Sequence, residues 1–261
     1  MSNYGIFDSH VHLDDEKFDA DREELIEALP SLGVTRMVNV GADIKSSLNS
    51  VELANKYDFI YAAVGVHPHD CENMSDKDNE TLESYVKNNK KTVAIGEIGL
   101  DYYYDNSPRD IQQKMFRLQM ELARNIDIPV ILHIRDAYED ALNILKYFGK
   151  MPANGVVHCF GGSVEFAHEV LRLGYRIGVG GVVTFSNAKK LVAVTSDVSL
   201  DDILLETDCP YMTPTPHRSE RNNPSYLSFV AQKIAQIKQI SAETVINTTY
   251  NNANSLFRIT D

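Results

Sequence analysis

The feature that most constrains the fold of this chain is an alternation of short apolar runs with longer amphipathic segments along its 261 residues. Eight of the apolar runs have the length and the β-rich composition of strands. They cover residues 5–9, 35–40, 59–66, 92–98, 129–133, 155–159, 175–179 and 202–206. Strands that alternate with helices pair in parallel, because each helix carries the chain back to the start of the next strand. The alternation therefore predicts an α/β fold.

The segments between the runs read as helices, and several follow a residue that caps helices well. Such start signals are Asp43, Ser75, Ser107 with Pro108, Asp136, Gly162 with Ser163, and Ser186, and two further helical segments close the chain. Eight strands with their helices over about 250 residues fit a (β/α)8 TIM barrel better than a doubly wound sheet, although the pattern alone leaves both open. No linker, low-complexity tract or solenoid repeat divides the chain, so residues 1–261 are expected to form a single domain.

Charge and composition limit the possible functions. The chain has 37 acidic and 25 basic residues, and its formal net charge of −12 opposes long-range attraction to nucleic acid or anionic membranes. A polyanionic substrate would have to be held by a local site. No apolar run approaches the roughly 18 residues of a membrane span and no secretory signal is recognisable, so a cytoplasmic location is expected. The three cysteines are scattered and are expected to be reduced thiols.

Two histidines, His10 and His12, stand two residues apart in IFDSHVHLDD. Alternate side chains of a strand point to the same face, so the two rings are expected on one side, near enough to share one ion. An edge strand or a solvated loop is the alternative, because so short a motif depends on its structural context.

Further residues that could bind metal recur where strands end. Glu97 lies at the end of the fourth run, His133 and His158 lie at the ends of the fifth and sixth, and Asp208 follows the eighth. In a barrel the carboxyl ends of all strands face one mouth, so these side chains should converge with the two histidines of the first run. Four imidazoles and two carboxylates exceed the needs of one tetrahedral ion, whereas two ions that share a carboxylate would use them all. The sequence therefore predicts a metal centre.

Six motifs of the chain resemble those of the TatD family of metal-dependent deoxyribonucleases, within the amidohydrolase-like barrel superfamily. They stand in order as FDSHVHLD, VGVHPHD, IGEIGLDYYY, ILHIRDA, VVHCFGG and LLETDCPYMTP. The resemblance implies one divalent ion held by His10, His12, Glu97 and Asp208, and a second held by Glu97, His133 and His158. Glu97 would then bridge two ions. Imidazole-rich ligation favours zinc or manganese, while the resemblance implies activity with magnesium.

The resemblance also implies hydrolysis of DNA phosphodiester bonds by a water that the two ions activate, with Glu97 and Asp208 as catalytic residues. Asp208 could take the proton of that water. The assembled site would be locally cationic, so DNA could be held there although the whole chain is acidic. No obligate protein partner is evident. Two other functions stay open: a metal-dependent amide or ester hydrolase, such as a deacylase of an aminoacylated substrate, and a barrel that binds metal without catalysis.

Basic side chains near these motifs could contact a substrate phosphate. They are His67 and His69 in VGVHPHD, Arg135 in ILHIRDA, and Arg218 and Arg221 in PHRSERNNPSY. A rim histidine with a structural hydrogen bond, or an ordinary surface arginine, is the alternative for each.

Two other groups of residues near the motifs have more than one interpretation. In PHRSERNNPSY, Ser219 and Asn223 stand where a glycine and an acidic residue commonly flank the RN pair in the family. The tyrosines at 102–104 follow Glu97 closely and could stack on an unpaired base or pack against the barrel rim.

Overall fold

The computed structural model describes residues 5–260 and contains eight parallel strands whose order in the sheet is their order in the chain. They are β1 (Ile6–Val11), β2 (Val34–Val40), β3 (Ile60–Val64), β4 (Thr92–Asp101), β5 (Val130–Arg135), β6 (Gly155–Val157), β7 (Tyr175–Val179) and β8 (Ile203–Leu205). All eight expected strands are confirmed, with ends that differ by up to three residues. The largest difference is in β4, which continues beyond the expected end to Asp101.

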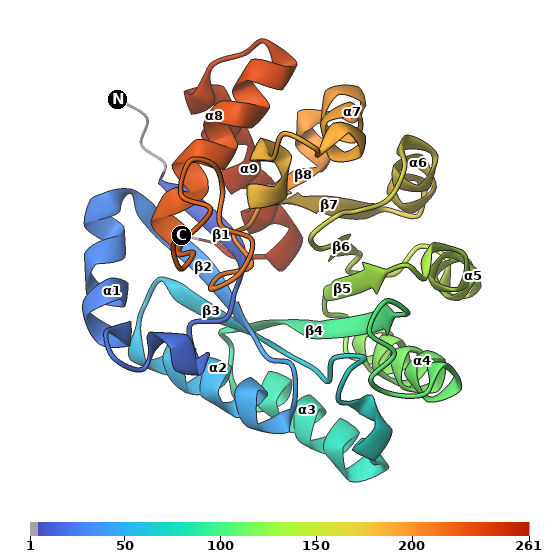
Figure 1. Cartoon of the computed structure of the whole chain (residues 1–261). Helices are drawn as coiled ribbons and strands as arrows, with labels where there is room; N and C mark the ends of the chain where they lie inside the picture. The colour runs from blue at the N-terminus through green and yellow to red at the C-terminus, as the bar shows by residue number, and fades with distance from the viewer. Residues whose placement is uncertain (1–4, 261) are drawn as a thin grey trace.

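The sheet curves round into a nearly closed barrel with the helices outside it (Figure 1). The last and first strands meet through one parallel bridge between Val11 and Cys209. The backbone N–H of His12 donates to the Cys209 carbonyl at 2.9 Å, and that of Asp208 donates to the His10 carbonyl at 3.0 Å. Closure of the barrel thus places Asp208 beside the two histidines of the first strand.

A buried side chain strengthens the same junction. Asp8 of β1 is inaccessible to solvent, and its carboxylate accepts hydrogen bonds from the Thr207 N–H at 2.9 Å and from the Thr207 hydroxyl at 2.6 Å. Each of these bonds joins residues that lie 199 positions apart. The position of the segment that carries Asp208 is therefore set directly by β1.

The helices cover the outer face of the sheet. They are α1 (Arg22–Ala28), α2 (Ile44–Lys56), α3 (Asp76–Asn88), α4 (Arg109–Asn125), α5 (Tyr138–Phe148), α6 (Val164–Arg172), α7 (Lys189–Asp197), α8 (Leu227–Lys238) and α9 (Ala242–Phe257). Of these, α1 was not expected from the sequence. Asp43 caps α2 by accepting from the Ser46 N–H at 2.6 Å, as expected for a residue of this type.

The hydrophobic core lies between the strands and the helices. Phe7 of β1, for example, packs against Phe257 of α9 with ring centroids 6.1 Å apart. In the described part of the chain, no helix is both long enough and apolar enough to cross a membrane.

Candidate metal centre

A cavity of about 470 Å³ opens at the carboxyl ends of the strands. Five histidines contribute to its lining: His12, His67, His69, His133 and His158. The carboxyl groups of its lining belong to Asp14, Asp15, Asp70, Glu97, Asp101 and Asp208, and its one arginine is Arg135. So many carboxylates beside a single guanidinium would repel an anion unless cations were bound among them. The donor set therefore suits metal ions.

The two histidines of the first strand converge as expected. The Nε2 atoms of His10 and His12 lie 3.1 Å apart. The Nδ1 of His12 lies 2.8 Å from the Val40 carbonyl oxygen, which can only accept, so this nitrogen carries the ring proton. The Nε2 of His12 is consequently left free to bind an ion, in the arrangement typical of metal-binding histidines.

Glu97 lies in β4 at the centre of the site, and its two oxygens face different groups of histidines. Oε2 is 3.4 Å from His10 Nε2 and 3.8 Å from His12 Nε2. Oε1 is 2.7 Å from His133 Nδ1 and 2.8 Å from His158 Nε2. A carboxylate with one oxygen toward each group has the geometry required of a bridging ligand.

His133 of β5 is held from its other side by Asp101. Its Nε2 lies 3.0 Å from Asp101 Oδ2, and His69 Nε2 lies at the same distance from that oxygen. Asp101 is fully buried. A carboxylate at Nε2 fixes the proton there and turns Nδ1 of His133 toward Glu97, which is how outer carboxylates commonly orient a metal-binding histidine.

Asp208 reaches the site from the segment after β8. Its Oδ1 lies 3.5 Å from His12 Nε2 and 3.9 Å from His10 Nε2. The side chain is 15% exposed, so it is open to the cavity on one side. It can therefore touch an ion held by the two histidines and also face a water in the cavity.

The pKa values of the residues at the site are shifted because buried carboxylates and histidines lie close together. Burial would raise the pKa of Glu97, but His158, His67 and His10 around it hold that pKa well below its usual range. Burial also opposes charge on His12, yet the neighbouring Asp208 and Glu97 raise the pKa of His12 to about 9. Protons on the histidines and divalent cations would balance the same carboxylates, which again fits a metal centre.

Three groups of side chains in the described residues bring their ligand atoms close enough to hold an ion: His10 with His12 and Asp208, His10 with His158 and Glu206, and His67 with Glu97 and His133. The first group belongs to the first expected ligand set. The third places His67 beside Glu97 and His133, with its Nε2 3.6 Å from Glu97 Oε1, whereas it was expected among the residues that contact substrate.

Two buried carboxylates at the site, Asp101 and Glu206, were not among the expected residues. Burial raises the pKa of Glu206 to about 7, and its Oε1 lies 3.7 Å from His158 Nδ1. Asp101 is four residues after Glu97, and Glu206 is two residues before Asp208. In extended backbone, residues an even number of positions apart point to the same face. This spacing pointed to the histidine pair, and it was also the signal that could have pointed to Asp101 and Glu206.

The structure brings Arg135 to the cavity but not the two loop arginines. Arg221 forms an ion pair with Asp21 at 2.6 Å. Arg218 donates to the Thr213 carbonyl at 3.0 Å and lies over the Phe185 ring. Neither lines the cavity. Both guanidinium groups hold the loop after β8 in place. This structural role accounts for the two arginines without any contact to a substrate.

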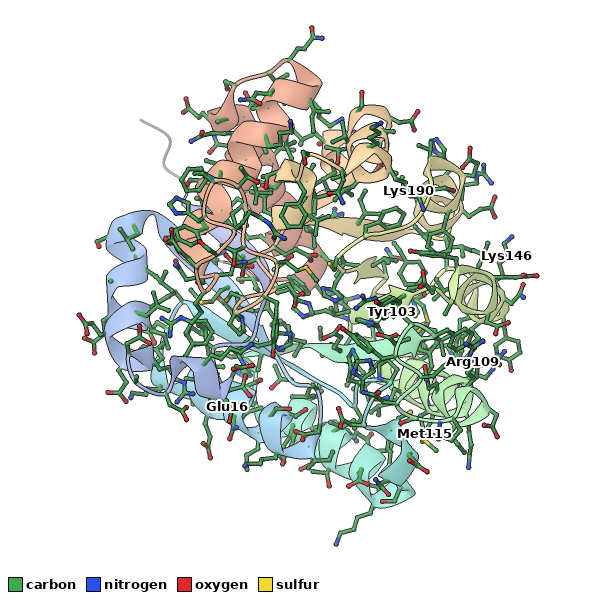
Figure 2. The ribbon with its side chains drawn as sticks, in the orientation of Figure 1. Glu16, Tyr103, Arg109, Met115, Lys146 and Lys190 are labelled. Carbon is green, nitrogen blue, oxygen red and sulfur yellow. The ribbon has the colours of Figure 1, made fainter. Side chains whose placement is uncertain are left out.

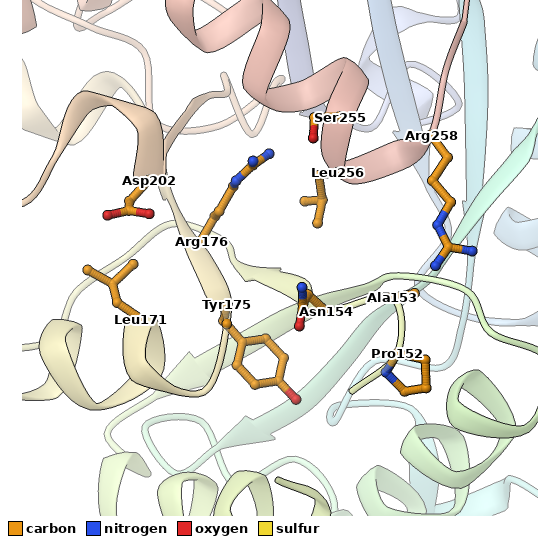
Figure 3. Close-up of a pocket in the computed structure, with 11 residues that line it drawn as sticks. Pro152, Ala153, Asn154, Leu171, Tyr175, Arg176, Asp202, Ser255, Leu256 and Arg258 are labelled. Atoms are coloured by element: carbon orange, nitrogen blue, oxygen red, sulfur yellow. The ribbon is translucent and has the colours of Figure 1, made fainter. Parts of the chain in front are cut away.

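A second cavity, of about 380 Å³, lies at the opposite end of the barrel. It is bordered by Gly174 and Tyr175 at the start of β7, by Asp202 before β8 and by the end of α9 (Figure 3). None of the candidate metal groups in the described chain includes a residue of this cavity. The candidate metal groups of the described residues all lie at the carboxyl ends of the strands.

Comparisons with known proteins agree with this geometry. The family described as TatD related DNase matches residues 7–258. The metal-dependent hydrolase YabD of Bacillus subtilis is 44% identical over 254 residues, which are 97% of this chain and 99% of the relative. The 3'-5' ssDNA/RNA exonuclease TatD of Pectobacterium atrosepticum is 33% identical over 97% of this chain and 100% of its own. The crystal structure of the TatD homologue YjjV of Escherichia coli has a TM-score of 0.92, 33% identity and 98% coverage of both chains.

Proposed function

The chain belongs to the TatD-related DNase family of metal-dependent hydrolases, and we propose that it hydrolyses the phosphodiester bonds of DNA with two divalent metal ions. The observation that carries the proposal is the placement of Glu97. One of its oxygens faces His10 and His12, and the other faces His133 and His158. Two groups of ligands that share one carboxylate favour a pair of ions over a single ion.

In this proposal His10, His12, Glu97 and Asp208 would hold the first ion. Glu97 and His133 would hold the second, with His158 and His67 as further nitrogen ligands on its side. Imidazole-rich ligation suits zinc or manganese, and magnesium is the third candidate. When bound, a pair of such ions acidifies a water, orients it and neutralises the charge that gathers on the phosphate oxygens.

The residues of this chain supply the remaining functions. Asp208 is deprotonated at neutral pH: burial would raise its pKa, but His12, His158 and His10 keep it below the usual range. It can therefore accept the proton of the attacking water. Arg135 lines the cavity. Its guanidinium group can therefore contact a phosphate oxygen that does not face the ions.

A phosphodiester substrate is favoured over an amide or a neutral ester on two grounds. The cavity with two bound divalent ions would attract an anion, although the chain as a whole carries a net charge of −12. In addition, the relative from Pectobacterium atrosepticum is named as an exonuclease of single-stranded DNA and RNA.

The test is to load the protein separately with magnesium, manganese and zinc and to incubate it with oligonucleotides labelled at either end. Both single-stranded and duplex oligonucleotides are tested as substrates. Release of mononucleotides from one end is the expected result, and the labelled end reports the polarity. If no metal form cleaves any oligonucleotide while an aminoacyl ester or amide is hydrolysed, the protein is a deacylase and the proposal is wrong.

A further inference from the structure

Large apolar side chains that remain exposed gather at the mouth of the metal-binding cavity. Among the described residues eight such side chains are exposed, and four of them, Tyr103, Tyr104, Tyr211 and Met212, lie on the two loops that follow β4 and β8. Tyr104, Tyr211 and Met212 line the cavity itself. Single exposed apolar side chains are common on protein surfaces, but a cluster of them beside a polar site indicates a binding surface.

The two tyrosines after β4 are the more open part of this cluster. Tyr103 is 59% exposed and Tyr104 is 55% exposed. Their rings stand edge to face with centroids 4.9 Å apart, and Figure 2 shows Tyr103 beside β4 and β5. Tyr102 differs from both: its hydroxyl is bonded to Asp140 at 2.8 Å and its side chain packs against the core. Packing at the barrel rim thus accounts for Tyr102, whereas the other two side chains remain more than half exposed.

The positions of these two rings are tied to the metal centre. Asp101 Oδ1 accepts hydrogen bonds from the backbone N–H groups of Tyr103 and Tyr104, each at 2.9 Å. The other oxygen of the same carboxylate holds His133 and His69. One buried side chain therefore sets both the orientation of a proposed metal ligand and the start of the tyrosine loop. A loop whose backbone is already held in place loses less entropy when its side chains bind a partner.

Arg135 completes the arrangement from the neighbouring strand β5. Its guanidinium carbon lies 4.1 Å from the centroid of the Tyr103 ring and 4.8 Å from that of Tyr104. In the described chain no carboxylate forms an ion pair with Arg135, whereas Arg221 and Arg109 pair with Asp21 and Asp105. A cation that is stacked on rings but not neutralised stays available for a phosphate.

We propose that Tyr103 and Tyr104 form a stacking site for an unpaired nucleobase of the substrate, next to the scissile phosphate held by the metal centre and Arg135. The inference rests on the proposed function and extends it to the part of the substrate that the metal ions do not touch. Aromatic rings beside a cationic site are the usual means of binding single-stranded nucleic acid, because every base has a flat face that can stack. A paired base inside a duplex does not offer that face.

Tyr211 on the opposite loop is a weaker candidate for the same role. Its hydroxyl donates to Asp15 Oδ2 at 2.9 Å, and Lys17 lies over its ring at 4.1 Å from the centroid. The side chain is 45% exposed, which is less than either tyrosine of the β4 loop. We therefore assign Tyr211 to the wall of the cavity and the stacking site to the β4 loop.

The experiment compares two phosphorothioate-linked oligomers of equal length, one of thymidines and one with abasic tetrahydrofuran units. Both carry the same fluorophore, and binding to the metal-loaded protein is measured by fluorescence anisotropy. Stacking is worth about 1–3 kcal/mol per base, so the wild type should bind the base-bearing oligomer about 5- to 150-fold more tightly. The double variant Tyr103→Ala/Tyr104→Ala should lose this preference with its metal content unchanged.

Two further variants separate stacking from other effects. Tyr103→Phe/Tyr104→Phe retains the rings and should retain the preference. Tyr147→Ala is a matched control, because Tyr147 is 72% exposed and has Arg117 near its ring but lies on α5 away from the cavity. It should bind like the wild type.

The proposal is overturned if the wild type binds both oligomers equally, or if the alanine double variant keeps the preference. Cleavage of ordinary phosphodiester oligomers is measured in parallel. Cleavage without a base preference would leave the proposed function standing and remove the stacking site. A base preference that depends on the tyrosines, without cleavage, would support the stacking site and contradict the proposed function.

Discussion

At the scale of single residues, the site depends most on Glu97, the side chain that contacts both groups of histidines. It is 4% exposed and sits within hydrogen-bond distance of His133 and His158. A buried carboxylate in such a place is stable only with cations or protonated partners around it. Its replacement therefore affects every charge in the site, whereas the replacement of one histidine affects mainly its own side.

Glu97→Ala should weaken binding of both ions, and His133→Ala should weaken chiefly the second. The measurement is calorimetric titration of metal into the apoprotein of each variant. His168→Ala is the matched control, because His168 is 46% exposed on α6 and forms an ion pair with Asp197. Full occupancy of both sites in Glu97→Ala would contradict the bridging role.

Asp208→Asn tests the proposed base at the same scale. The amide keeps the shape and an oxygen ligand but cannot take a proton, and a positioned general base contributes about 10²- to 10⁴-fold to the rate. We expect kcat on an oligonucleotide to fall by about that factor while elemental analysis finds the metal retained. Asp58→Asn, which changes an exposed carboxylate outside this cavity, should leave kcat unchanged. Near wild-type turnover by a metal-containing Asp208→Asn variant would exclude the base role.

At the scale of elements, helix α4 positions two of the segments that form the site. Gln119 accepts from the Val66 N–H at 2.8 Å and donates to the Val66 carbonyl at 3.0 Å, directly beside His67. Gln112, two turns earlier, bonds in the same way to the N–H and carbonyl of Asp101. Both glutamines are buried. One face of a single helix thus holds the backbone at the end of β4 and in the loop after β3.

Gln119→Leu should destabilise the fold, because it leaves a buried N–H and a buried carbonyl of Val66 without partners. Each such group costs about 1–3 kcal/mol, so the free energy of unfolding should fall by about 2–6 kcal/mol. Urea denaturation of the metal-loaded protein measures the change.

Gln113→Leu, on the same helix, is the control for that substitution. Gln113 is partly exposed and bonds to the side chains of Tyr102 and Asp140, which water can reach. Its loss should cost less than about 1 kcal/mol. Equal losses in the two variants would show that Gln119 does not hold the backbone in the way described.

At the scale of the whole molecule, folding gathers acidic side chains that repel one another around one end of a barrel. Glu97, Asp101, Glu206 and Asp208 come from two regions of the chain about a hundred residues apart. Ions that bind the folded chain and not the unfolded chain stabilise it by mass action. The metal centre should therefore contribute to stability as well as to catalysis.

Removal of the metal with a chelator should lower the melting temperature. At an ion concentration about 100-fold above its dissociation constant the stabilisation is about 2.7 kcal/mol, which corresponds to about 5–10 °C for a chain of this size. Scanning calorimetry before and after chelation, with elemental analysis of the same samples, provides the measurement. Readdition of metal should restore the original value. A protein without bound metal whose melting temperature and activity do not respond to chelator would contradict a metal centre.

Much of the barrel follows from local sequence pattern, and so does the placement of the candidate ligands at the ends of its strands. Strand and helix periodicity depends on neighbouring residues, so the eight strands could be predicted from the chain alone. The two-residue period likewise predicted that His10 and His12 face the same way, as the 3.1 Å between their Nε2 atoms confirms. The apolar runs do not mark every strand end: β4 extends further than its run because Asp101 continues the strand as a buried polar residue.

What only the tertiary structure decided is which charged group meets which partner. The sequence shows only that Asp101 and Glu206 stand an even number of residues from Glu97 and Asp208. Only folding buries them against His133 and His158. The engagement of Arg221 with Asp21, 200 positions away, could not be read from its loop either. The local sequence pattern predicts the direction in which a side chain leaves its strand, because this direction depends on the geometry of the neighbouring backbone. Its burial, protonation and pairing depend on groups from distant parts of the chain, because electrostatic interactions and desolvation act through space.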